Sequence, residues 1–81
     1  MQFLMHENEY HTSDFNEAAV LRYFNHKLLH VDKRMPRAVF AFEIKPDTEQ
    51  LVRDYRVREL LVEPYAFYQC EREIKSRLYN D

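Results

Sequence analysis

The clearest folding signal in this chain of 81 residues is the stretch 37–44, Arg37-Ala38-Val39-Phe40-Ala41-Phe42-Glu43-Ile44. Successive side chains of a β-strand point to opposite faces of a sheet, so residues two apart share a face. The side chains predicted to face the core are Ala38, Phe40, Phe42 and Ile44. Those predicted to face away are Arg37, Val39, Ala41 and Glu43. The stretch therefore predicts a strand with one buried face.

The residues before this strand predict a hairpin that spans about 27–44. Lys27 to Asp32 read as its first strand, with Leu29 and Val31 on one face and Leu28 and His30 on the other. The turn between the strands is predicted at residues 33–36, Lys33-Arg34-Met35-Pro36. A further short strand is expected around Tyr10, and residues 1–9 are predicted to be loosely patterned.

Three helices are predicted, at about 14–24, 46–56 and 64–79. Asp14 followed by Glu17 fits a capping box at the first start, and Asn25 suits the left-handed position after a helix. Pro46 and Pro64 suit the first position of the next two helices, where a missing N–H costs nothing.

The third helix carries an apolar stripe, which consists of Phe67, Cys70, Ile74 and Leu78. Cys70 is therefore expected to be a buried, unreactive thiol. For residues 57–63 the sequence leaves two alternatives, a short strand or a bent continuation of the second helix. The chain is predicted to be one α+β domain over 1–81, with a small, mostly antiparallel sheet and helices on one face.

Composition excludes several classes of site. The chain has no glycine, and the phosphate-binding, dinucleotide-binding, nucleophile-elbow and EF-hand loops all need it for tight turns or close backbone approach. One cysteine and no apolar start or long apolar run predict a cytoplasmic protein without a disulfide, signal peptide or membrane span. A formal net charge of −2 argues against non-specific binding to nucleic acid.

Several short motifs follow one another in an ordered set over residues 10–79. They are Thr12-Ser13-Asp14, Ala18-Ala19, Lys27-Leu28-Leu29, Phe40-Ala41-Phe42-Glu43, Leu51-Val52, Val62-Glu63-Pro64, Phe67 and Lys75-Ser76-Arg77-Leu78-Tyr79. In this order the chain resembles a family of small domains of unknown function from bacterial, archaeal and viral or plasmid genomes. The resemblance implies a compact α+β domain and a mobile-element setting, and it carries over no activity and no functional residue.

No residue set predicts a metal, a cofactor or catalysis. The candidate metal ligands His6, His11, His26, His30 and Cys70 lack zinc-site spacing and are interpreted as surface histidines and a core thiol. His11, Ser13 and Asp14 contain the residue types of a catalytic triad, but triads assemble from distant segments, and helix capping explains Ser13 and Asp14. We therefore expect no enzyme, no cofactor and no small-molecule substrate.

Basic side chains on the hairpin are the first candidate contact, for nucleic acid or an acidic partner. They are Lys27, His30, Lys33, Arg34 and Arg37. The alternative is a solvated hairpin whose charges protect an edge strand from pairing. A second basic cluster, Arg53, Arg56 and Arg58, is interleaved with Asp54 and Glu59, and intramolecular ion pairs are expected there.

Apolar and aromatic residues exceed what so small a core can hold, which predicts a protein interface. Its candidate residues are Val57, Leu60, Leu61, Tyr65, Tyr68 and Tyr79. We expect a non-enzymatic protein-interaction module that binds a protein partner or itself, in the role of an accessory or inhibitor protein of a phage or other mobile element. The alternative is a nucleic-acid-associated protein that contacts phosphates through the basic hairpin 26–37.

Overall fold

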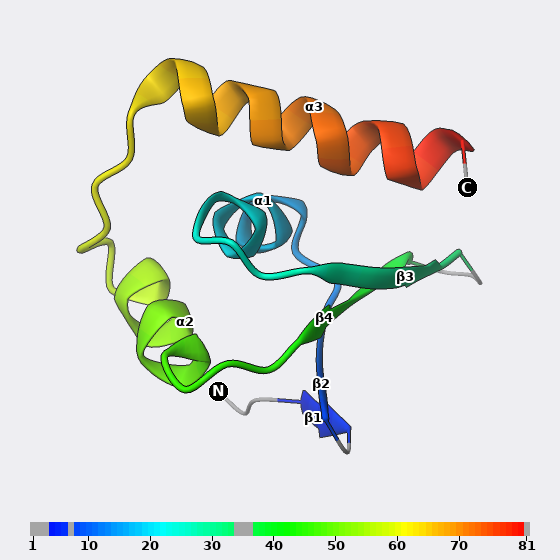
Figure 1. Cartoon of the computed structure of the whole chain (residues 1–81), viewed down its shortest axis with the longest axis horizontal. Coiled ribbons are helices and arrows are strands. Elements are labelled where there is room, and N and C mark those ends of the chain that lie inside the picture. The colour runs from blue at the N-terminus through cyan, green and yellow to red at the C-terminus, as the bar shows by residue number, and fades with distance from the viewer. Residues whose placement is uncertain (1–3, 7, 34–36, 81) are drawn as a thin grey trace.

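The computed structural model describes residues 4–6, 8–33 and 37–80, with side chains described for 8–33 and 37–79. Its elements are β1 (Leu4–His6), β2 (Glu9–Thr12), α1 (Phe15–Tyr23), β3 (Leu28–Asp32), β4 (Val39–Glu43), α2 (Thr48–Arg56) and α3 (Pro64–Asn80). One antiparallel sheet contains the four strands in the order β1-β2-β4-β3. Helix α1 lies between the sheet and α3, with α2 beside it (Figure 1). The predicted α+β fold is confirmed.

Strand β4 forms the centre of the core, as its alternation predicts. Phe40 and Phe42 are buried and pair on the two sides with β2 and β3. The prediction that Ala41 faces away from a buried core is only half right, because Ala41 is buried as well. Ala41 pairs with His11 on one side and His30 on the other, so it lies between these two side chains on the outer face.

The predicted faces of β3 are wrong. The register shifts between Leu28 and His30, which is the signature of a β-bulge. Leu28 and Val31 consequently pair opposite the core residues Phe42 and Phe40, whereas Leu29 is exposed. A strict alternation cannot predict this, because one extra residue reverses the faces that follow it.

Helix α1 is the central helix, and residues 17–21 are all buried. The carboxylate of Asp14 accepts hydrogen bonds from the backbone N–H groups of Asn16 and Glu17, as predicted for an N-cap. Asn25 adopts φ 69°, and the N–H groups of Asn25 and His26 bond to the carbonyls of Arg22 and Leu21. This is a Schellman motif, and the predicted left-handed stop is confirmed.

Helix α2 begins at Thr48, two residues after the predicted start at Pro46. Thr48 is buried, and its Oγ1 accepts a 2.7 Å hydrogen bond from the backbone N–H of Lys45. The helix ends at Arg56 as predicted, and a second Schellman motif follows, with Arg58 at φ 64°. A left-handed arginine is uncommon, because the side chain disfavours this conformation.

Residues 59–63 form neither the predicted strand nor a continuation of α2, and they cross irregularly to α3. Glu63 caps α3 by accepting hydrogen bonds from the N–H groups of Tyr65 and Ala66. On the predicted stripe of α3, Ile74 is fully buried, whereas Phe67, Cys70 and Leu78 are half-buried. Cys70 is therefore not the fully buried thiol that the spacing predicted, because the neighbours of α3 cover its apolar stripe fully only at Ile74.

Some predictions fall on residues without a described structure. These are 1–3 and 7 of the loosely patterned start, and 34–36 of the hairpin turn. Within the rest of the start, Leu4–His6 form a strand, as does the segment around Tyr10. Of the helices described, none is both long and apolar enough to cross a membrane.

Candidate functional site

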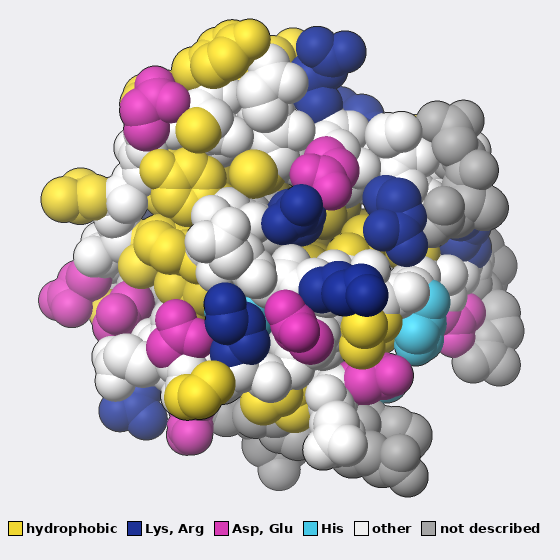
Figure 2. All heavy atoms as spheres, viewed as in Figure 1, with side chains coloured by type: hydrophobic (Ala, Val, Ile, Leu, Met, Phe, Trp, Pro, Cys, Tyr) yellow, Lys and Arg dark blue, Asp and Glu magenta, His cyan; other side chains and the backbone are white. Residues whose placement is uncertain are grey.

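Large hydrophobic side chains gather on the surface of residues 57–68. The exposed fractions are 56% for Val57, 93% for Leu61, 68% for Tyr65 and 52% for Tyr68. We call this region the 57–68 surface. Hydrophobic atoms cluster on the left of Figure 2, over the connection from α2 to α3 and the start of α3. Clustered exposed apolar side chains of this kind mark interaction sites.

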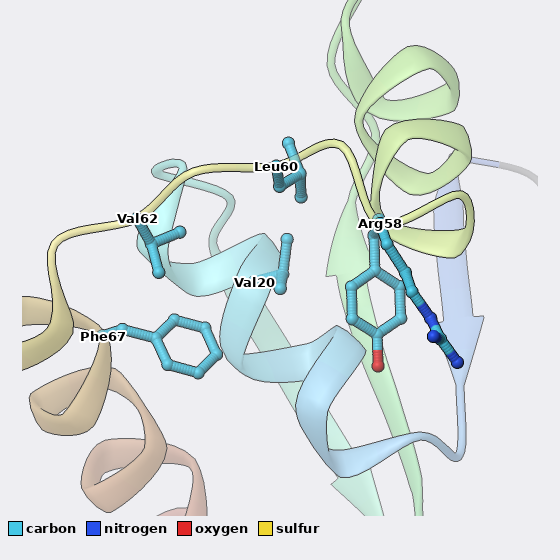
Figure 3. Close-up of a pocket in the computed structure, with 6 residues that line it drawn as sticks. Val20, Arg58, Leu60, Val62 and Phe67 are labelled. Carbon is cyan, nitrogen blue, oxygen red and sulfur yellow. The ribbon is translucent and has the colours of Figure 1, made fainter.

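An apolar pocket lies beside this surface, between α1, α2, the connection and α3. Its lining residues are Val20, Tyr55, Arg58, Leu60, Val62 and Phe67, and its volume is about 260 Å³. The side chains of Val20, Leu60, Val62 and Phe67 converge in Figure 3. Typical small-molecule sites have volumes of roughly 300–1,000 Å³ and enclose most of the ligand. This open pocket therefore suits a single apolar side chain better than a small-molecule substrate.

Two contacts position the connection that carries Leu60 and Leu61. The backbone N–H of Glu63 donates a 2.9 Å hydrogen bond to the hydroxyl of Tyr23 on α1. The Tyr23 ring also lies 6.1 Å from the ring of Phe67, centroid to centroid. The connection is thus held to α1 without regular secondary structure, and Leu60 lines the pocket while Leu61 projects into solvent.

Arg58 is the only charged residue that lines the apolar pocket. Its neighbours Arg53 and Arg56 have the predicted intramolecular ion pairs, with Glu49 at 4.0 Å and Glu17 at 3.3 Å. The prediction is wrong for Arg58, whose guanidinium has no ion pair with any described residue. A cation held at an apolar rim in a left-handed conformation is a candidate contact for a partner.

Tyr79 is exposed as expected, but it does not belong to the 57–68 surface. It follows Tyr65 by 14 residues on α3, which places it about 21 Å along the helix axis. Between them the guanidinium of Arg72 lies over the Tyr68 ring, 6.0 Å from its centroid. The structure therefore brings together five of the six predicted interface residues and separates the sixth.

The basic hairpin residues do not form one cluster. Lys27, His30, Lys33 and Arg37 are all exposed, and Arg34 lies outside the described residues. Lys27 and Lys33 are at opposite ends of β3, about 20 Å apart at the rise of a strand. Carboxylates lie among them: His30 Nε2 is 3.3 Å from Glu9 Oε1, and the backbone N–H of Lys27 donates a hydrogen bond to Glu43 Oε2. This arrangement weakens the case for a run of phosphate contacts.

A histidine–carboxylate group on the open face of the sheet was missed by sequence reasoning. The Nε2 atoms of His11 and His30 lie 2.9 and 3.3 Å from the same Glu9 oxygen. The hydrogen bond from His11 is the main reason that the pKa of Glu9 is lowered. Only the pairing of β2 and β3 with β4 brings His30 here, so local spacing held no sign of it. In the described part of the chain, no group of three or more His, Cys, Asp or Glu side chains is arranged to hold a metal ion.

Two buried polar groups were also missed, and both serve the fold. His26 was expected at the surface, but it is fully buried, with Nε2 2.8 Å from the Thr48 hydroxyl. Glu17 does not complete a capping box; it turns inward and accepts a 2.8 Å hydrogen bond from the Tyr10 hydroxyl. Burial, followed by the Glu17 carboxylate, raises the pKa of Tyr10 far above its usual range.

The residue types of a triad at positions 11–14 do not assemble. His11 bonds to Glu9 on the outer face of the sheet, whereas Asp14 caps α1 and accepts a 3.1 Å hydrogen bond from Tyr55. Burial is the main cause that raises the pKa of Tyr55 to about 12. His11 and Asp14 therefore have separate structural partners.

Comparison with known proteins places this chain in a family and identifies no individual relative. No curated protein and no solved structure matches the chain. A protein family described as a domain of unknown function (DUF5659) matches residues 7–80, nearly the whole chain. The protein belongs to the DUF5659 family of domains of unknown function.

Proposed function

We propose that this protein is a non-enzymatic protein-interaction module that binds through the 57–68 surface. The supporting observation is a group of four large hydrophobic side chains within a stretch of twelve residues. Each of the four is more than half exposed, and an apolar pocket of about 260 Å³ lies beside them. Burial of exposed apolar area is the main driving force of protein association. An aromatic or aliphatic anchor that enters a pocket is the usual centre of such an interface.

The proposal includes a role as an accessory or inhibitor protein of a phage or other mobile element. Such a protein acts by occupying a surface of its target and needs no turnover. The absence of glycine from the whole chain supports only the non-enzymatic part of this role, since the common phosphate-binding and nucleophile loops depend on glycine.

The test is affinity capture with a matched pair of variants. Immobilised wild-type protein, Leu61→Ser and Tyr79→Ser are exposed to the same host extract, and retained proteins are identified by mass spectrometry. A partner of the 57–68 surface is retained by the wild type and by Tyr79→Ser, and it is lost by Leu61→Ser. Direct titration of the purified partner then gives the affinity. Equal retention by all three chains would contradict the proposal.

The nucleic-acid alternative has one observation in its favour: Lys27, Lys33 and Arg37 are all exposed. It requires binding that weakens steeply with salt and is lost when Lys33 and Arg37 become Ala. Gel mobility of DNA and RNA at low salt, with and without the protein, tests it. Unchanged mobility would remove this alternative.

A further inference from the structure

The charges at the start of the 57–68 surface are self-complementary. Arg58 and Glu59 are adjacent in the chain, both are exposed, and neither side chain has an ion pair within the described part of the molecule. They lie between the exposed Val57 and Leu61. The third charge of the surface, Glu63, already caps α3. A cation and an anion without ion pairs can meet their counterparts in a second copy, because a two-fold axis can place each charge opposite its complement.

The shape of the same segment is also self-complementary. Leu60 and Val62 line the apolar pocket, whereas Leu61 between them projects outward and is 93% exposed. Each copy thus presents one protruding aliphatic side chain on the same connection that lines one apolar pocket, and Figure 3 shows that pocket. Two copies related by a two-fold axis can exchange these side chains reciprocally.

The 57–68 surface would supply part of the area that a stable contact needs. A standard interface buries about 800 Å² on each partner, which is roughly one seventh of this chain's accessible surface of 5769 Å². Of the twelve residues 57–68, nine are exposed and the other three line the apolar pocket. The segment therefore offers exposed apolar and aromatic side chains, and aromatic residues are enriched in interfaces.

We propose that the partner bound by the 57–68 surface is a second copy of this chain. Leu61 of each copy enters the apolar pocket of the other, and Arg58 of each copy lies opposite Glu59 of the partner subunit. This inference rests on the proposed function, because it names the partner for the same surface.

The test is a charge exchange measured by sedimentation equilibrium over a range of protein concentrations. The wild type forms a dimer. In a dimer of Arg58→Glu, or of Glu59→Arg, both of the proposed charge pairs between the copies become pairs of like charges. Each substitution therefore raises the dimer dissociation constant by roughly tenfold or more. An equimolar mixture of the two variants restores a dimer, as does the double variant Arg58→Glu/Glu59→Arg. Leu61→Ser gives a monomer, and circular dichroism verifies that every variant is folded.

Arg53→Glu is the matched control, since Arg53 is an exposed arginine of α2 outside the 57–68 surface, and it leaves the dimer intact. A wild type that is monomeric at every concentration overturns the second copy as partner. The proposed function is then decided separately, by the capture experiment with Leu61→Ser. If the wild type is a dimer and Leu61→Ser and Arg58→Glu dimerise equally well, the contact lies elsewhere on the molecule, and the inference is also overturned.

Discussion

The guanidinium of Arg56 lies 3.3 Å from the carboxylate of Glu17, whose side chain is only 1% exposed. The same guanidinium is 3.4 Å from the hydroxyl of Tyr10, which donates to the other Glu17 oxygen. Three elements, β2, α1 and α2, therefore meet at one buried carboxylate. A charge removed from water in this way persists only when it is paired and hydrogen-bonded.

Replacement of Arg56 by Ala is expected to lower the free energy of unfolding by about 2–4 kcal/mol, because Glu17 would remain buried without its counter-charge. Arg53→Ala is the control on the same helix. Its ion pair with Glu49 is long and exposed on both sides, so the expected loss is about 0.5 kcal/mol or less. Urea denaturation of the two variants measures both values, and equal losses would contradict this account of Glu17.

A second prediction concerns the left-handed backbone of Arg58. Residues other than glycine lose roughly 1–2 kcal/mol in this conformation, so Arg58→Gly is expected to unfold at a higher urea concentration than Arg58→Ala. Both variants lack the guanidinium, and their difference isolates the backbone effect. Both variants are denatured in urea at the same low protein concentration, so that self-association contributes equally to the two midpoints. Equal midpoints for the two variants would show that residue 58 is not left-handed in solution.

The sequence predicts the parts of this fold that depend on local chemistry. Asp14 and Asn25 mark the two ends of α1, Pro64 opens α3, and the alternation around Phe40 identifies the core strand. Each of these features is set by residues within one turn or one strand. The same reasoning finds the exposed Val57, Leu61, Tyr65 and Tyr68 by exclusion, since no stripe or alternation assigns them to the core.

The rest depends on pairings between distant segments. The bulge at Leu29 reverses the predicted faces of β3. His26 is buried against Thr48 of α2, and Glu17 is buried between Tyr10 of β2 and Arg56 of α2. The pocket needs Val20 of α1 and Phe67 of α3 to meet around Leu60. No local pattern contains that information, so the candidate residues are predictable while the pocket beside them is not.

The burial of His26 predicts a pH dependence of stability. Its Nδ1 lies 3.2 Å from the carbonyl of Phe24 and its Nε2 2.8 Å from the Thr48 hydroxyl, which together suit a neutral ring. Burial is the main cause that lowers the pKa of His26 below its usual 6.5. The unfolded chain therefore takes up a proton first, so the contribution is complete above about pH 6.5 and is lost as the pH falls.

Urea denaturation between pH 8 and pH 5 checks this dependence in the wild type and in His26→Gln. The variant is expected to be less stable than the wild type at every pH, because it loses the packing and hydrogen bond of His26 with Thr48. Its free energy of unfolding should decline less than that of the wild type between pH 6.5 and pH 5. The other ionisable groups are common to both chains, so the difference between the two curves reports His26. Parallel curves would show that His26 does not remain neutral in the folded state.

The last prediction concerns Cys70, the single thiol of the chain. Its partial burial, followed by the charge of Glu73, raises the pKa of the thiol. Since the thiolate is the reactive form, alkylation by iodoacetamide near neutral pH should be slower in the folded protein than in urea.

The substitution Glu73→Gln tests the electrostatic part of this shift. It removes the carboxylate that raises the pKa of Cys70, and it releases Arg22, whose positive charge lowers the pKa of the same thiol. The rate should therefore rise by a factor on the order of two, because solvent screens the charges in part. Glu71→Gln, one residue from Cys70, is the control and should leave the rate unchanged. Alkylation that is equally fast in the folded and unfolded chains would show that α3 does not protect the thiol.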